Sequence, residues 1–218
     1  MHNFNNRIAG IAALALFSLL LLAGCGAVTN VGHPTGLDSI IIETDGKITY
    51  DFGGDFADER YRTDELVDMA KTQIAEFNAE EGRKAVEFVG SVEENRGGRR
   101  VYLEYRFADS ESFEKMTGYK LSYTPVEEYA SEGFGFSGSS FVSAKDAQLV
   151  KSGADLIAGS SGSHLIVTNF PGAVMGGYQI AYYSENAQLL TAGDTVYATA
   201  KTQPEEGEQV FIQVLLRK

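Results

Sequence analysis

Four acidic side chains lie close together in the sequence and are the first candidates for metal chemistry. They are Asp51, Asp55, Asp58 and Glu59, and the pair Gly53-Gly54 stands among them. Carboxylate oxygens are ligands that Ca²⁺ prefers, but an EF-hand loop needs alternating oxygen ligands and a bidentate acid at its end. The spacing here does not match that pattern. The sequence therefore predicts a solvated acidic loop, and no cofactor or metal, with calcium as the one exception to test.

Nucleophilic chemistry has one candidate, a serine-rich segment beside a histidine. Residues 159–163 read Gly-Ser-Ser-Gly-Ser and precede His164. A serine next to a histidine base is an arrangement of nucleophilic catalysis. Neither this segment nor residues 135–139 has the Gly-x-Ser-x-Gly pattern of a nucleophile elbow. A polar turn before a strand is the preferred interpretation, and we expect no enzymatic activity.

Cys25 is the only cysteine, and the residues before it are arranged for processing at a membrane. The stretch Ile8–Leu22 carries no charge and follows a single arginine, Arg7. A positive residue, an apolar run of this length and small residues at its end form the layout of a secretory signal. The run is shorter than the roughly 20 residues that a membrane-spanning helix needs. A cleavable signal peptide is therefore predicted over residues 1–24.

Residues 22–25 read Leu-Ala-Gly-Cys and resemble the lipobox of bacterial lipoproteins at all four positions. In that family the cysteine thiol takes a diacylglyceryl group, with acyl chains such as palmitate, and the chain is cut before the cysteine. The resemblance implies cleavage between Gly24 and Cys25 and a lipid on Cys25. Two acyl chains hold a protein stably on a membrane. The implied location is the extracytoplasmic face of a cell membrane, in the cell envelope.

The net charge of residues 25–218 limits the kinds of partner that this part of the chain can bind. The whole chain has 18 Lys and Arg against 30 Asp and Glu, a formal net charge of −12. Because Arg7 is the only one of these in residues 1–24, the other 194 residues carry −13. Such a domain is repelled by nucleic-acid phosphates and by anionic lipid headgroups. We expect no nucleic-acid partner. The expected partners are the membrane, through the lipid, and an envelope protein or wall component.

The pattern of elements predicts an α+β fold, an antiparallel sheet with one main amphipathic helix and a β-rich C-terminal half. A lipidated tether over 25–37 leads to an α+β subdomain over 38–130 and a β-rich subdomain over 131–218, which are two units or one. Strands over 39–43 and 47–52 flank Asp45-Gly46, a favoured hairpin pair. Two further strands follow, with Val86, Phe88 and Val92 on one face of the first. Tyr102, Glu104 and Arg106 are expected on the wetted face of the second.

The clearest helix is predicted over residues 64–80. Thr63 is the expected N-cap and Gly82 the expected stop. An apolar stripe recurs at three- and four-residue spacing and is expected to pack on the sheet. Its members are Leu66, Met69, Ala70, Gln73, Ile74 and Phe77. Asp109 or Ser110 is expected to cap a short helix that carries Phe113 and Met116.

Aromatic residues are mildly enriched, with 11 tyrosines and 13 phenylalanines but no tryptophan. Tyrosine offers rigid, amphipathic contact area and could form an exposed recognition face. The candidates are Tyr102, Tyr119, Tyr123, Tyr129, Tyr182 and Tyr183. Half-buried strand positions explain most of these residues, and the absence of tryptophan weakens the case for a carbohydrate platform.

The segments 61–66, 74–78 and 103–113 resemble uncharacterised lipoproteins of anaerobic Gram-positive gut bacteria. Those chains share a lipobox, a hairpin, a Tyr…Asp-Glu-Leu helix start and a strand-rich end. The resemblance implies a location and a fold type, and no site residue follows from it. The leading hypothesis is a non-enzymatic envelope lipoprotein that binds or scaffolds. The alternatives are a substrate-binding component of a transporter and an envelope enzyme with an unrecognised site.

Overall fold

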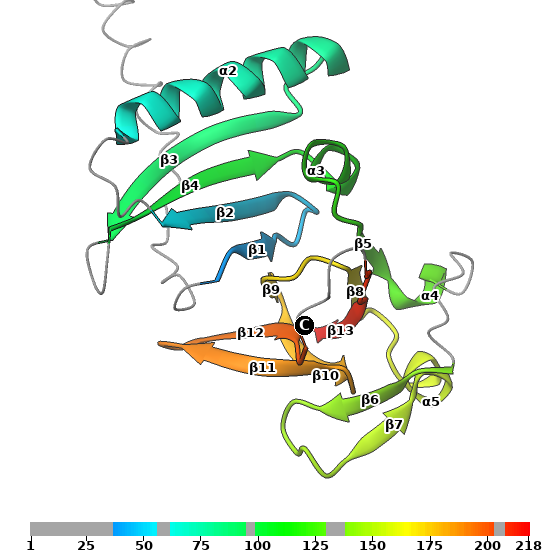
Figure 1. Cartoon of the computed structure of the whole chain (residues 1–218). Coiled ribbons are helices and arrows are strands. Elements are labelled where there is room, and N and C mark those ends of the chain that lie inside the picture. The colour runs from blue at the N-terminus through cyan, green and yellow to red at the C-terminus, as the bar shows by residue number, and fades with distance from the viewer. Residues whose placement is uncertain (1–36, 56–61, 95–98, 130–137, 203–207) are drawn as a thin grey trace, which may run out of the picture. The chain divides into compact units, whose positions relative to one another are not determined.

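The structure is a computed structural model, and it describes residues 37–55, 62–94, 99–129, 138–202 and 208–218 (Figure 1). The predicted signal peptide and Cys25 lie outside these ranges. In the described ranges, the strands form two sheets, here named sheet A and sheet B, and the predicted α+β class is confirmed. No helix in these ranges has the length and apolar character that a membrane span requires.

Sheet A has seven strands in the described part of the chain, in the order β11-β12-β9-β1-β2-β4-β3. Their bounds are β1 Ser39–Ile42, β2 Ile48–Asp55, β3 Val86–Glu94, β4 Arg100–Phe107, β9 Ala173–Gly176, β11 Ala187–Ala192 and β12 Thr195–Ala200. The predicted hairpin is present as β1 and β2, and Gly46 has the positive φ of 85° that its turn requires.

Sheet B has six strands in the described ranges, in the order β5-β8-β13-β10-β6-β7. Their bounds are β5 Leu121–Pro125, β6 Ser140–Ser143, β7 Val150–Ser152, β8 His164–Thr168, β10 Gln179–Ser184 and β13 Ile212–Arg217. The segments 38–130 and 131–218 each contribute strands to both sheets, and residues 33–218 form one compact unit.

The strand pairs of the described residues are antiparallel with one exception. β1 pairs with β9 in parallel, with Ser39 opposite Ala173 and Ile42 opposite Gly176. This pair joins the N-terminal hairpin to a strand more than 100 residues later in the chain. The predicted antiparallel sheet is therefore mixed at its centre.

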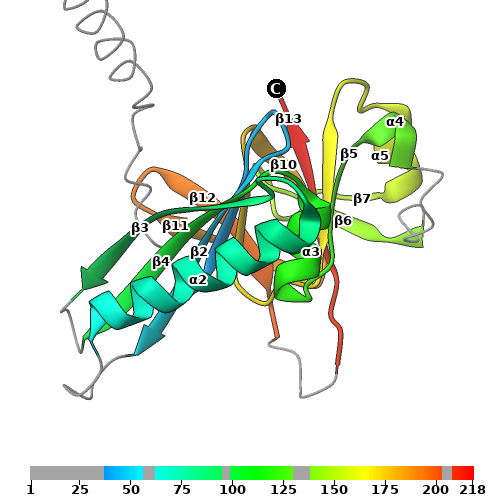
Figure 2. The same cartoon turned by 90° about the horizontal axis from the view of Figure 1, so that it is seen from above.

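The main core lies on one face of sheet A. Part of this face is covered by the helices α2 (Thr63–Glu81) and α3 (Ser110–Thr117), which lie along β2, β3 and β4 (Figure 2). The part over β1 and β9 packs on sheet B, where Ile166 and Val214 join the same core. The far face of sheet B has a smaller core with α4 (Val126–Tyr129) and α5 (Gly153–Ala158).

The helix α2 confirms the prediction over 64–80, but its details differ. Arg62 occupies the N-cap position without a side-chain cap, while the hydroxyl of Thr63 donates to Glu93 at 3.0 Å. Of the predicted stripe, Ala70 and Ile74 are buried, whereas Phe77 is half-buried and Met69 is 62% exposed. The helix packs chiefly on the edge strand β3, so a narrow stripe is enough to cover it.

The predicted faces of Val92 in β3 and Tyr102 in β4 were wrong, and in each case a local feature of the strands explains the difference. A β-bulge shifts the register between Phe88 and Gly90, so Val92 lies opposite Tyr102 and is 41% exposed on the other face. The predicted wetted position Tyr102 is only 2% exposed. Its ring lies over Gly53, where a Cβ atom would stand 2.5 Å from Tyr102 Cε1.

Candidate functional site

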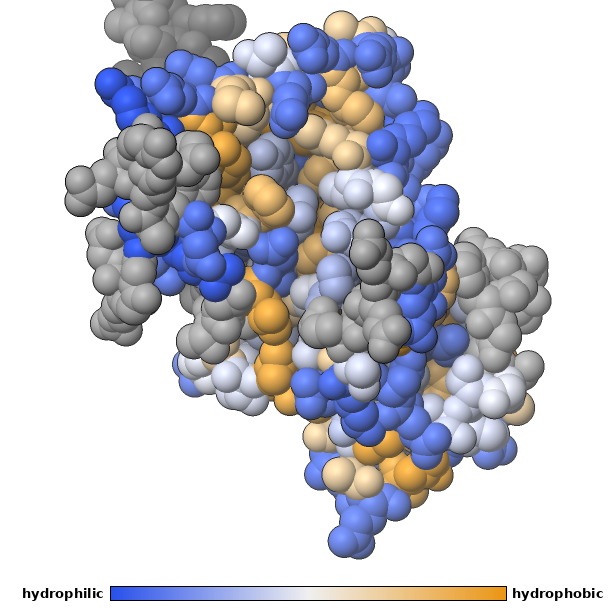
Figure 3. Space-filling view, viewed as in Figure 1, coloured by the Kyte–Doolittle hydropathy of each residue, from blue (hydrophilic) through white to orange (hydrophobic). Residues whose placement is uncertain are grey.

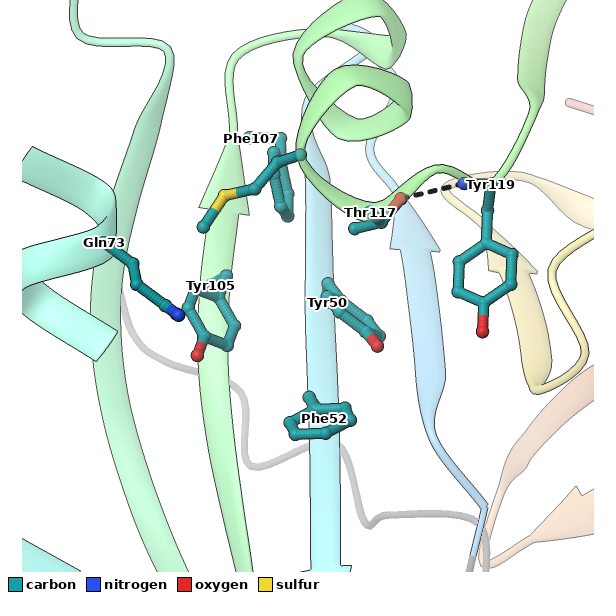
Figure 4. Close-up of a pocket in the computed structure, with 8 residues that line it drawn as sticks. Tyr50, Phe52, Gln73, Tyr105, Phe107, Thr117 and Tyr119 are labelled. Atoms are coloured by element: carbon teal, nitrogen blue, oxygen red, sulfur yellow. Dashed lines mark hydrogen bonds between the residues drawn. The ribbon is translucent and has the colours of Figure 1, made fainter. Parts of the chain in front are cut away.

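An open pocket of about 310 Å³ lies on the helix-covered face of sheet A (Figure 4). We name it the aromatic pocket. Its lining comes from the strands β2 and β4, the helices α2 and α3, and the segment that follows α3. The lining residues are Tyr50, Phe52, Gln73, Tyr105, Phe107, Met116, Thr117 and Tyr119. In the space-filling view, apolar side chains gather below α2 between hydrophilic residues (Figure 3).

Strand alternation builds the floor of the aromatic pocket. Tyr50 lies directly opposite Tyr105 on β4, and their ring centroids are 6.1 Å apart at 29°. Phe52 follows two residues later on the same face, with its ring centroid 6.1 Å from that of Tyr50. The ring of Phe113 of α3 makes a T-shaped contact with the ring of Tyr50, with 5.8 Å between the centroids. The rings are therefore held in place before any ligand arrives.

The mouth of the pocket is exposed and has spare hydrogen-bonding capacity. Phe52 is 45% exposed, and Gln73 is an exposed residue of α2. The hydroxyl of Thr117 already has hydrogen-bond partners, because it donates to the Phe113 carbonyl at 2.7 Å and accepts the Tyr119 N–H at 3.3 Å. Within the described ranges, the hydroxyl groups of Tyr50, Tyr105 and Tyr119 make no hydrogen bond, nor does the Gln73 amide.

The described residues that line the aromatic pocket are uncharged. Burial raises the pKa of Tyr50, and the nearby Asp38 adds to the increase; burial also raises the pKa of Tyr105. Both phenols therefore stay protonated at neutral pH and act as hydrogen-bond donors as well as acceptors.

The two described members of the predicted acidic loop, Asp51 and Asp55, lie in different surroundings. Asp51 is 5% exposed inside β2, where it accepts a hydrogen bond from the Ser39 hydroxyl at 3.3 Å. Asp55 is exposed at the end of the same strand, with Oδ1 3.3 Å from Nε of Arg100. Four strand positions separate the two by about 13 Å, while Asp58 and Glu59 lie outside the described residues. The expectation of a solvated loop is wrong for Asp51. In the described ranges no group of acidic, histidine or cysteine side chains is arranged to hold a metal ion.

Asp51 should make the stability of the protein depend on pH. Burial raises the pKa of Asp51 from 3.8 to about 6, although the Ser39 hydrogen bond opposes the increase. The native state then binds more protons than the unfolded state between these values, so stability falls as pH rises through this range. Because Asp51→Asn cannot ionise, we expect it to gain stability relative to the wild type between pH 4 and pH 7, by on the order of 2–3 kcal/mol. Urea melts at pH 4, 5.5 and 7 measure this, and a constant difference between the two proteins would contradict it.

The serine and histidine segment does not form a nucleophilic pair in the described structure. His164 begins β8, as predicted. Its ring stacks on that of Tyr123 at 4.9 Å and is tilted against that of Tyr178 at 5.4 Å between centroids. Its Nδ1 atom is buried without a hydrogen-bond partner among the described residues, so none of their serine hydroxyls bonds to it there. Burial and the charge of Lys218 lower the pKa of His164. This histidine is a packing residue of sheet B.

The six tyrosines that were candidates for a recognition face do not form one, and burial in the strands, the preferred interpretation, accounts for several of them. Tyr102 and Tyr129 are 2% exposed and Tyr182 is 7% exposed, so half of its proposed members are buried. Tyr119 lines the aromatic pocket. Phe52 and Tyr105 were not predicted as site residues, because nothing in the sequence shows which aromatic strand positions stay uncovered. Aromatic residues at alternate positions of neighbouring strands are the signal in the sequence that could have indicated this pocket.

Comparisons with known proteins provide no relative, because no protein-family model, curated protein or solved structure matches the chain.

Proposed function

We propose that this chain is a membrane-anchored extracytoplasmic lipoprotein that binds a component of the cell envelope in its aromatic pocket. The anchor is the lipid on Cys25 that the lipobox resemblance implies. The aromatic pocket is the observation that supports a binding role. Its volume of about 310 Å³ is at the lower end of the 300–1,000 Å³ range of ligand sites, and such sites are mostly apolar with a few placed polar groups.

The chemistry of the lining favours binding over catalysis. Tyrosine hydroxyls with raised pKa values exchange few protons at neutral pH. Aromatic rings that are packed in advance lose little conformational entropy when a ligand binds. A pocket of this composition recognises shape and hydrogen-bonding pattern.

The binding role is tested with the full lipidated chain in detergent and isolated cell-wall fragments. We expect a saturable rise in melting temperature without turnover of the fragments. Phe52→Ala should abolish most of the rise, whereas Val196→Ala, which truncates a side chain 40% exposed on β12, should retain it. Equal responses of the two variants would exclude the aromatic pocket as the binding site.

The anchor is tested at Cys25. Cys25→Ala removes the thiol that receives the lipid, so we expect no incorporation of fatty acid and an uncleaved precursor. Metabolic labelling with a clickable fatty acid, followed by electrophoresis, measures both. Arg7→Lys keeps the positive charge before the apolar run and should be labelled like the wild type. Equal label on Cys25→Ala would refute the lipoprotein assignment.

A further inference from the structure

We infer that the ligand of the aromatic pocket is a neutral saccharide unit of an envelope glycan. This inference rests on the proposed binding function and specifies the chemistry of the ligand. It follows from the rings, the free hydrogen-bonding groups and the charges of the pocket, taken together.

The rings fit the apolar face of a sugar. A pyranose ring has an apolar face of C–H groups, and an aromatic ring offers it a flat surface from which water is displaced. Phe52 presents such a ring at the mouth with 45% of its surface exposed, and Tyr50 and Tyr105 lie beside it. The chain has no tryptophan, but these three side chains supply ring area at one place.

The free polar groups fit the hydroxyls of a sugar. Three tyrosine hydroxyls and the Gln73 amide line the same pocket, and within the described ranges none of them makes a hydrogen bond. An acyl chain in this place would remove these groups from water without replacing their hydrogen bonds, which opposes binding. A ligand with hydroxyls around an apolar ring satisfies both kinds of surface.

The uncharged side chains of the described lining favour a neutral ligand over an ionic one. The described lining has no cation to pair with an anionic ligand, and the chain carries −12 in total. It also has no carboxylate to pair with a cation that loses its water on entry. A neutral ligand has no such cost.

The size of the pocket favours one sugar unit over a peptide. Gln73 of α2 stands at one side of the pocket and Thr117 of α3 at another (Figure 4), and the volume of the pocket is about 310 Å³. A proline-rich peptide binds along an elongated groove, since it advances about 3.1 Å for each residue. The open mouth at Phe52 lets a glycan continue into solvent from the bound unit.

The test uses the full lipidated chain in detergent and five probes of known structure. Two are neutral saccharides, triacetylchitotriose and xylotriose. The others are an anion, glucuronic acid, a cation, choline, and a peptide, decaproline. Saturation-transfer NMR detects which ligand protons approach the rings, and calorimetric titration gives Kd. We expect at least one neutral trisaccharide to bind, with saturation on its C–H face.

Three variants locate the binding. Phe52→Ala should weaken binding of that trisaccharide about tenfold or more, a loss typical of an aromatic contact. Tyr105→Phe removes only a hydroxyl and should weaken it about threefold to tenfold. Val196→Ala should bind like the wild type.

Two results would overturn the saccharide inference. One is that no neutral trisaccharide binds, or that Phe52→Ala binds it as well as the wild type. The other is that choline, glucuronic acid or decaproline binds in the pocket instead. If cell-wall fragments still raise the melting temperature through Phe52, the proposed binding function stands without the saccharide. If they do not, both fail.

Discussion

Phe113→Ala is expected to lower the free energy of unfolding by about 3–5 kcal/mol. Phe113 is 0% exposed, and it contacts the edges or faces of three other rings, those of Tyr50 at 5.8 Å, Phe107 at 5.4 Å and Phe170 at 6.3 Å between centroids. Alanine would leave a cavity under the aromatic pocket that these rings, held on three separate segments, can fill only in part. Urea denaturation followed by near-ultraviolet circular dichroism measures the loss.

Phe52→Ala is the matched control, because it removes the same side chain from a position that is 45% exposed and also in ring contact with Tyr50. We expect it to cost less than about 1 kcal/mol. The pair also separates stability from binding, since Phe113→Ala should unfold easily while Phe52→Ala should fold and lose its ligand. Similar losses of stability in both variants would mean that α3 does not hold the floor of the pocket.

Gly172→Ala is expected to destabilise the protein by about 3 kcal/mol or more. A Cβ atom at this position would stand 2.2 Å from the backbone oxygen of Asp38 and 2.5 Å from Cε1 of Phe170. The backbone oxygen cannot turn away, because it accepts the N–H of Ala173 at 2.9 Å at the start of the parallel β1–β9 pair. The substitution therefore strains the only parallel contact among the described strands.

Gly90→Ala tests whether this loss comes from crowding and not from glycine replacement in general. Gly90 lies in β3 next to the bulge, and a Cβ atom there would meet nothing within 4 Å. We expect its unfolding free energy to stay within about 0.5 kcal/mol of the wild type. Equal effects of the two substitutions would show that β1 and β9 do not approach each other as closely as this structure describes.

The sequence alone determined the elements whose signals are local. The helix α2 could be predicted because its apolar spacing, the acids Asp64 and Glu65 in its first turn and Gly82 at its end act within a few residues of each other. The cap of α3 is local too, since the Asp109 carboxylate accepts the N–H of Ser112 at 2.8 Å. The lipidation of Cys25 also depends on a short linear segment, and it stays a prediction.

Only the tertiary structure decided which faces are buried and where the pocket lies. Periodicity shows which residues share a face, but it does not show what covers that face. The bulge after Phe88 moved Val92 of β3 to the opposite face of the sheet. The absence of a side chain at Gly53 left room for the ring of Tyr102. The parallel pairing of β1 with β9 depends on contacts more than 100 residues apart, which no local pattern reports. The aromatic pocket exists because α2 and α3 pack on sheet A and leave the ring of Phe52 exposed, and that arrangement is set by packing between distant segments.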